Sequence, residues 1–378
     1  MKVTFVIAQA DLSGGVRVVS IYAERLRRRG HDVVIVARPS RAPTLREKAR
    51  SALMGRALPS AARSGPTHLD DLDVPVHFID SHRPVTAADV PDADVIVATW
   101  WETAEWVEAM PESKGAKAYF LQHYEVHAGQ PVARVEKTWR SAMHKITISQ
   151  WLVDLARDHF GDSTVSLVPN AVDLEQFNSP PRGKQTVPTV GVMYSVVPFK
   201  GCEVSLKAVD LASRVVPKLR LVAFGNRDPS PEMPMPAGSE FRKQPPQDVL
   251  KEIYGKCDAW LFSSRSEGFG LPLLEAMACR TPVIATPAGA APDLCAGGGG
   301  ILVPRDDPAA MARAIERIAG MPESAWKELS EKAHHTASRY TWDDAVGKFE
   351  AALRLAVERT RRGDFVPAPA TPAPATAS

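Results

Sequence analysis

The chain has 378 residues, of which 44% are hydrophobic and 24% charged, the composition of a globular protein whose length favours two domains over one. Its net charge is only +2, and its four cysteines lack Cys-x2-Cys spacing, which argues against a zinc site or a disulfide framework and favours a reducing cytosol. The apolar opening at residues 3–8 is too short for a signal peptide, and no apolar run reaches membrane-spanning length, so any membrane contact would be peripheral.

Strand-like apolar segments alternate with helical stretches from the first residue onward. These segments are continuously apolar, which is typical of a parallel sheet covered on both faces. We expect strands at residues 3–8, 32–37, 74–79, 94–99, 118–122 and 145–149, and again at 189–194, 219–224, 259–262, 282–285 and 300–303. Because this alternation of strands and helices begins again at residue 189, we predict an α/β protein with two doubly wound, Rossmann-like domains. Ligands of such sheets bind at the carboxyl ends of the strands, so we expect a site in a cleft between two facing sheets.

Basic residues are concentrated early in the chain. Residues 25–63 contain eleven basic side chains against two acidic ones. Apolar residues recur there at near-helical spacing, so the segment is either a basic amphipathic helix suited to an anionic membrane or a solvated loop. Both interpretations stay open. Nucleic acid is not expected as a partner, because aromatic residues do not interleave with the basic ones.

The second half begins near residues 168–173, which read Val-Pro-Asn-Ala-Val-Asp and precede a linker-like stretch at 179–188. We therefore expect one domain at residues 1–168 and another at 169–340. A helical pattern follows at 341–362. The tail at 363–378 consists mainly of Pro, Ala and Thr, has nothing to bury and is predicted to be disordered.

The most informative segment starts at Ser266 and reads Ser-Glu-Gly-Phe-Gly-Leu-Pro-Leu-Leu-Glu-Ala-Met-Ala. It follows an apolar strand and enters a helix predicted at residues 271–279, so residues 263–270 form a strand-to-helix turn. Gly268 and Gly270 let a phosphate approach the main chain, and the helix start offers N–H groups and a positive end. Glu267 lies at the mouth of this turn and Glu275 one helical turn inside. The two carboxylates can therefore reach groups on either side of a bound phosphate.

Three further features are candidates for the same site. A second glycine-bearing turn, with Gly15, follows the first strand and precedes a helix expected from Arg17, but it lacks the Gly-x-Gly-x-x-Gly spacing of nicotinamide and flavin proteins. Lys200 lies between a strand and a helix, where an ammonium can neutralise phosphate charge. His123 follows the strand at 118–122 and so belongs to a carboxyl end. His123 and His127 have metal-like spacing, but no third ligand is apparent.

The acidic pairs at residues 71 and 73 and at residues 92 and 94 imitate a metal-binding Asp-x-Asp motif. Both pairs precede strands and so belong to the opposite ends from the expected site. We interpret them as turn acids, and we expect no metal and no other cofactor.

The glutamate turn, followed by Arg-Thr-Pro-Val-Ile-Ala at residues 280–285, resembles glycosyltransferase family 4, a family of retaining enzymes with the GT-B fold and a Glu-x7-Glu motif. The resemblance is to the bacterial surface-glycan type. It implies that Glu267 contacts hydroxyls of the donor sugar and acts in catalysis. It also implies that the amides of Phe269, Gly270 and Leu271 bind the diphosphate and that Glu275 holds the ribose.

The same resemblance assigns the other candidates. It implies that Gly15 lies near the diphosphate and the acceptor, that His123 contacts the donor sugar, and that Lys200 stabilises the leaving diphosphate. It implies an acceptor-side first domain, a nucleotide-sugar-binding second domain and a C-terminal helix that crosses back to the first.

One position departs from the family pattern. Five residues before Lys200 the family usually has an arginine, and this chain has Ser195. A neutral hydroxyl cannot replace a guanidinium, so another cation must share the phosphate charge if the chain is an enzyme. Arg17, Arg227 and Arg265 are candidates between which the sequence does not choose.

The expected function is transfer of a hexose from a nucleoside-diphosphate sugar to a hydroxyl of a glycan, glycolipid or small-molecule acceptor, with retained anomeric configuration. We expect it in the cytoplasm or peripherally at the inner face of the membrane. Hydrolysis by the two glutamates is a poorer hypothesis, because Glu275 is needed at the ribose. A catalytically silent sugar-nucleotide-binding subunit is the main alternative, and Ser195 is its support. The nucleobase, sugar, acceptor, linkage and oligomeric state do not follow from the sequence.

Overall fold

The computed structural model describes residues 1–41, 66–70, 72–127 and 129–365, which form two compact units. Unit 1 comprises Met1–Ile146, Ala156–Ser166 and Lys348–Ser378, and unit 2 comprises Thr147–Leu155 and Leu167–Gly347. Most of the basic segment, Asp71 and nearly all of the expected disordered tail lie outside the described residues.

Unit 1 is built on a sheet with the order β3-β2-β1-β4-β5-β6-β7 in the described residues. The strands are β1 (Lys2–Ile7), β2 (Asp32–Ala37), β3 (Val76–Phe78), β4 (Val95–Ala98), β5 (Ala116–Leu121), β6 (His144–Thr147) and β7 (Ser166–Leu167). β1 pairs in parallel with β2 on one side and with β4 on the other. The chain therefore winds outward from β1 in both directions, and the β1/β4 boundary is the switch point where open sheets bind ligands.

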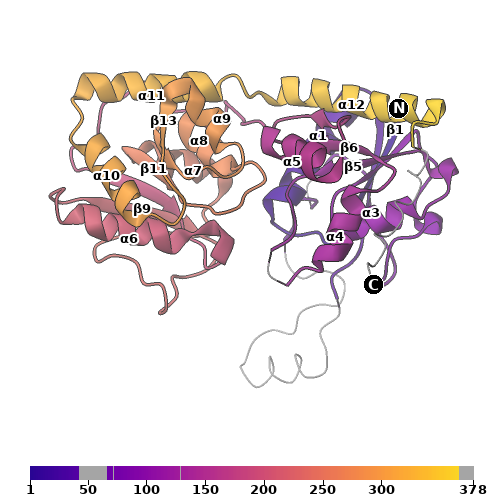
Figure 1. Ribbon diagram of the computed structural model, residues 1–378, viewed down its shortest axis with the longest axis horizontal. Coiled ribbons are helices and arrows are strands. Elements are labelled where there is room, and N and C mark those ends of the chain that lie inside the picture. The colour runs from indigo at the N-terminus through magenta and orange to yellow at the C-terminus, as the bar shows by residue number, and fades with distance from the viewer. Residues whose placement is uncertain (42–65, 71, 128, 366–378) are drawn as a thin grey trace, which may run out of the picture. The chain divides into compact units, whose positions relative to one another are not determined.

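The helices of this part of the chain pack an aromatic core. They are α1 (Gly14–Arg28), α3 (Trp101–Glu108), α4 (Val132–Trp139), α5 (Gln150–Phe160) and α12 (Trp342–Arg362), with short turns η1 (Ala87–Asp89) and η2 (Glu112–Lys114). Phe349 of α12 stacks on Tyr22 of α1 with ring centroids 4.3 Å apart and meets Phe120 of β5 edge-on at 5.0 Å. Figure 1 shows α12 in yellow at the end of the colour series. The last helix thus completes the core of unit 1, although it is remote from β5 in sequence.

Unit 2 repeats the architecture with the order β10-β9-β8-β11-β12-β13. The strands are β8 (Thr189–Met193), β9 (Arg220–Gly225), β10 (Glu240–Lys243), β11 (Ala259–Phe262), β12 (Val283–Ala285) and β13 (Gly300–Leu302). All five neighbouring pairs are parallel. β8 lies between β9 and β11, so the switch point of this sheet is the β8/β11 boundary.

Helices cover both faces of the second sheet. They are α6 (Cys202–Ser213), α7 (Leu250–Gly255), α8 (Leu271–Ala278), α9 (Ala291–Leu294), α10 (Pro308–Ala319) and α11 (Glu323–Ala337), with the turns η3 (Pro198–Lys200), η4 (Gln247–Val249) and η5 (Cys295–Gly299). α6 packs with α10, and α8 packs with α11, as Figure 1 shows. Val190, Leu206, Leu261, Ile315 and Trp326 are buried in the core between these layers.

The prediction of two doubly wound, Rossmann-like sheets is confirmed, and the predicted strands are found within a few residues of their expected bounds. Two short strands were missed. β7 is only two residues long, and β10 reads Glu-Phe-Arg-Lys at the sheet edge, so neither offers an apolar run.

The expected start of the first long helix was wrong. α1 begins at Gly14, not near Arg17, because the Ser13 side chain caps it by accepting the N–H of Val16 at 3.4 Å. Gly15 therefore belongs to the first turn of a helix. In the described part of the chain, no helix combines the length and the apolar character needed to cross a membrane.

Candidate functional site

The glutamate-bearing turn at residues 263–270 connects β11 to α8 at the switch point of unit 2. Gly270 precedes the helix with a φ of +101°, and a Cβ placed on it would lie 3.0 Å from the Phe262 ring. Both the dihedral angle and the space therefore require glycine. Gly289 approaches the turn even more closely, since a Cβ there would lie 2.5 Å from the Phe269 carbonyl oxygen.

Carbonyl groups of this turn are held by neighbouring elements. The Gly268 carbonyl accepts from Ser149 Oγ at 2.8 Å and from Trp151 Nε1 at 3.0 Å. The Phe269 carbonyl accepts the N–H of Ala290 at 2.9 Å. These bonds fix the orientation of the peptide planes in the turn.

The backbone amides at the end of the same turn, unlike its carbonyl groups, are not engaged in hydrogen bonds in the part of the chain that the structure describes. Within the described residues, the backbone N–H groups of Phe269, Gly270 and Leu271 donate no hydrogen bond. They lie at the positive end of α8, and Pro272, which has no N–H, follows them. Consecutive amides at a helix start form an anion site of the kind that binds phosphate.

Lys200 and Glu267 form an ion pair beside the turn. Lys200 Nζ lies 2.6 Å from Oε1 and 2.7 Å from Oε2 of Glu267, whose side chain is only 9% exposed against 23% for the lysine. The loop that carries Lys200 is tied to the turn, because Ser263 Oγ donates to the Gly201 carbonyl at 2.7 Å and the Arg265 N–H to the Phe199 carbonyl at 2.8 Å. The structure thus brings the expected phosphate cation and the expected sugar ligand into direct contact.

Glu275 lies on the inner side of α8 and is buried. Its Oε2 accepts the hydroxyl of Tyr254 from α7 at 2.8 Å. Nothing in the sequence pointed to Tyr254, because a tyrosine shortly before a buried strand is an ordinary core residue.

The structure separates the three arginines that could replace the one missing at Ser195. Arg265 is already paired: its Nε lies 2.6 Å from Asp306, and its hydrogen bond to Glu203 raises the pKa of the guanidinium. Arg17 lies on α1 in unit 1. Arg227 is exposed just beyond the carboxyl end of β9, the strand beside β8, and no ion pair engages it within the described residues.

In unit 1, Gly15 and His123 lie at the same end of the sheet. Gln122, the residue before His123, donates through Nε2 to the Gly15 carbonyl at 3.1 Å. His123 is half-buried, and its ring centroid lies 6.0 Å from that of His127. The described part of the chain contains no cluster of three or more His, Cys, Asp or Glu side chains that could hold a metal ion.

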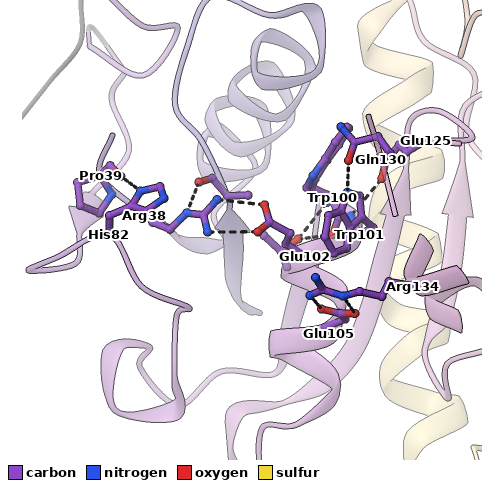
Figure 2. A network of polar contacts seen from close by, with 12 residues as sticks. Arg38, Pro39, His82, Trp100, Trp101, Glu102, Glu105, Glu125, Gln130 and Arg134 are labelled. Atoms are coloured by element: carbon purple, nitrogen blue, oxygen red, sulfur yellow. Dashed lines mark hydrogen bonds and ion pairs between the residues drawn. The ribbon is translucent and has the colours of Figure 1, made fainter. Parts of the chain in front are cut away.

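A polar network lies at the carboxyl ends of the unit 1 strands (Figure 2). Arg38, directly after β2, donates to both carboxylate oxygens of Glu102 at 3.3 and 3.0 Å and through Nε to the Ala8 carbonyl at 3.0 Å. Glu125, which is almost fully buried, accepts the N–H of Trp101 at 3.1 Å, and burial raises the pKa of its carboxyl group well above the usual range. Sequence reasoning missed this network, although the place of Arg38 at a strand end could have signalled it.

Comparisons with known proteins agree with this architecture. A family model described as Glycosyltransferase Family 4 matches residues 12–176, and one described as Glycosyl transferases group 1 matches residues 184–320. The structure of Anabaena HepE in complex with UDP-glucose superimposes with a TM-score of 0.68 at 16% identity, over 96% of this chain and all of that one.

Two curated relatives are named D-inositol 3-phosphate glycosyltransferase. The protein of Streptomyces bingchenggensis is 37% identical over 32% of this chain and 27% of its own length, and that of Stackebrandtia nassauensis is 29% identical over 56% and 54%. The chain thus spans about a quarter to a half of the length of these relatives. The two glycosyltransferase domain models together match most of the chain, which is therefore of the glycosyltransferase family 4 and group 1 type and has the GT-B fold.

Proposed function

We propose that the protein transfers a hexose from a nucleoside-diphosphate sugar to an acceptor hydroxyl, with retention of anomeric configuration and without a metal ion. The observation that carries the proposal is the junction between the turn and α8, where the amides of residues 269–271 donate no hydrogen bond within the described residues. Glu267 precedes these amides and Glu275 follows them. A diphosphate supplies the anion, and a sugar and a ribose supply hydroxyls on either side of it.

Charge develops on the leaving diphosphate as the glycosidic bond breaks. In our proposal the amides of Phe269, Gly270 and Leu271, close to Gly268, receive the phosphate oxygens, and Lys200 neutralises them. Because Lys200 is paired with Glu267 in this structure, donor binding redistributes its hydrogen bonds between carboxylate and phosphate. Glu267 then accepts from sugar hydroxyls, and Glu275 accepts from the ribose.

Arg227 is our candidate for the second cation. The β8–β9 register pairs Met193 with Phe224, so Ser195 and Arg227 each follow shortly after the paired ends of neighbouring strands. An arginine that extends from β9 could bring a positive charge to the region that Ser195 leaves neutral. Arg265 is less suited, since Glu203 and Asp306 already hold it.

We take the classes of donor and acceptor to be tested from the names and titles of the similar proteins. HepE was solved with UDP-glucose, so UDP-glucose is the first donor to test. The curated relatives' names suggest a phosphorylated cyclitol as one acceptor class, beside a bacterial surface glycan or a lipid-linked saccharide. We assign Gly15 and His123 the roles that the family resemblance implies, and we propose a cytoplasmic enzyme, peripheral to the inner membrane face if its acceptor is lipid-linked.

A silent sugar-nucleotide-binding subunit is the second candidate, and Ser195 favours it. Its Oγ accepts the Val197 N–H at 3.2 Å, as a loop residue would, and it carries no charge to a phosphate. A silent subunit binds nucleotide but hydrolyses no donor.

The test is slow donor hydrolysis and nucleotide binding across a panel of nucleoside-diphosphate sugars, with and without EDTA. We expect one donor to be hydrolysed at a rate that EDTA leaves unchanged and that falls in Glu267→Gln. Glu252→Gln serves as the matched control, because Glu252 is exposed on α7. Binding without hydrolysis of any donor would favour the silent subunit, and loss of activity in EDTA that Mg²⁺ restores would refute the metal-free mechanism.

A further inference from the structure

Tyr254 is a buried phenol that contacts a glutamate of the candidate site. It lies on α7, has no exposed surface, and its hydroxyl is 2.8 Å from Glu275 Oε2. α7 and α8 lie on either side of β11 in sequence, so this contact joins two separate helices.

The Tyr254 ring is held on several sides. Trp260 of β11 meets it edge-on with ring centroids 4.6 Å apart, and Phe224 and Phe177 lie at 6.0 and 6.2 Å. The backbone is fixed as well, because the Tyr254 carbonyl accepts the hydroxyl of Thr281 at 2.7 Å. Such packing leaves the phenol one orientation, so the hydroxyl is a fixed donor for Glu275.

A carboxylate that receives a sugar hydroxyl must present its oxygen in a defined direction, because a hydrogen bond weakens steeply as its angle departs from linearity. A glutamate side chain has three rotatable bonds, and its orientation costs entropy unless a neighbour fixes it. A rigid phenol on Oε2 therefore restricts the plane in which the Glu275 carboxylate lies.

We propose that Tyr254 is a positioning residue that orients Glu275 for the ribose hydroxyls of the nucleotide and thereby makes the site selective for ribose. The inference rests on the proposed function, since it gives Glu275 the ribose. It adds the residue on which discrimination between ribonucleotide and deoxyribonucleotide depends.

The experiment is calorimetry of UDP, ADP and GDP with the wild type, followed by the 2′-deoxy and 3′-deoxy forms of the tightest binder. Removal of the contacted hydroxyl should weaken wild-type binding by about tenfold or more, the usual scale of a hydrogen bond to a charged group. In Tyr254→Phe the ribonucleotide should lose most of that advantage, while the deoxy form binds as it does to the wild type. The ratio of the two affinities should therefore fall toward one.

Tyr194→Phe is the matched control. Its hydroxyl is also in the interior of unit 2, where it donates to the Met233 carbonyl at 2.8 Å and accepts the N–H of Ser230 at 2.8 Å, without contact to Glu275. We expect Tyr194→Phe to keep the ribose selectivity of the wild type. In a Glu275→Gln background, Tyr254→Phe should cause no further loss of selectivity, because the two residues act through one contact.

A folded Tyr254→Phe variant that keeps the wild-type affinity ratio would overturn the inference and leave the proposed function intact. An equal loss of affinity for both nucleotides would also overturn it, because that is what a merely structural tyrosine gives. If the wild type binds nucleotide but ignores the ribose hydroxyls, the role of Glu275 fails together with that of Tyr254. If no nucleotide binds, the proposed function fails first.

Discussion

The two glycine-bearing turns differ in how firmly the protein holds them. The turn at residues 263–270 in unit 2 is mostly buried, and Ser149, Trp151 and Ala290 bond to its carbonyls. The turn that precedes α1 in unit 1 is exposed, with Leu12 at 47%, and its glycines already belong to the helix. A preorganised turn suits the fixed geometry of a diphosphate, whereas an exposed one tolerates variation.

The charged side chains near the strand ends of the two units also differ in their arrangement. In unit 2, Lys200 reaches Glu267 of the turn from a separate loop, the one that follows β8. In unit 1, Arg38 and Glu102 satisfy one another in the network of Figure 2. We therefore expect substitutions in unit 2 to affect nucleotide binding and turnover most, and the following predictions test that ranking.

Lys200→Ala should have the largest effect. We expect donor turnover to fall by about a hundredfold or more, the usual scale for loss of one group that stabilises charge in the transition state. Steady-state donor hydrolysis measures it, with Lys207→Ala as control, because Lys207 is exposed on α6. Equal rates in the two variants would mean that the phosphate charge is met elsewhere.

Glu267→Gln should separate binding from turnover. The change keeps the shape but removes the negative charge that holds Lys200, so the lysine becomes more available to phosphate. We expect affinity for the free nucleoside diphosphate to stay equal or to rise slightly, while turnover falls strongly. Calorimetry and donor hydrolysis on the same sample decide this, and a large loss of nucleotide affinity would contradict the proposed division between Glu267 and Glu275.

Gly270→Ala and Gly14→Ala compare the two turns directly. Gly270 has a φ of +101° and only 3.0 Å to the Phe262 ring, whereas a Cβ on Gly14 meets nothing within 4 Å. We expect Gly270→Ala to cost about 1–3 kcal/mol of unfolding free energy and to weaken nucleotide binding. Gly14→Ala should leave binding unchanged and stabilise α1 by up to about 1 kcal/mol. Urea unfolding measures the change in unfolding free energy for both variants. Similar losses of stability at the two positions would contradict the difference that we infer between the two turns.

Arg227→Ala should have the smallest effect, a loss of nucleotide affinity of several fold, since an exposed charge is screened by solvent. Arg17→Ala, in unit 1, is the comparison. If Arg17→Ala lowers nucleotide affinity and Arg227→Ala does not, the second cation comes from unit 1. Higher salt should reduce the contribution of Arg227 to nucleotide affinity.

Several features of the protein follow from its sequence alone. The apolar segments with intervening helical stretches predicted both doubly wound sheets, because strand and helix periods are local properties of the chain. The turn between β11 and α8 was also predictable, since glycine spacing and a proline at the helix start act over a few residues. The charged edge strand β10 was missed because it lacks such a local signal: its formation depends on pairing with β9 rather than on its own residues.

Only the tertiary structure decided which side chains meet. Lys200 and Glu267 are 67 residues apart in sequence, and Gln122 and Gly15 are 107 apart. Tyr254 and Glu275 meet because β11 places α7 and α8 against each other, and Arg265 is removed from the candidate cations because Glu203 and Asp306 reach it. Such contacts depend on long-range packing, for which no local sequence period exists, and they determine which residues bear charge toward a ligand.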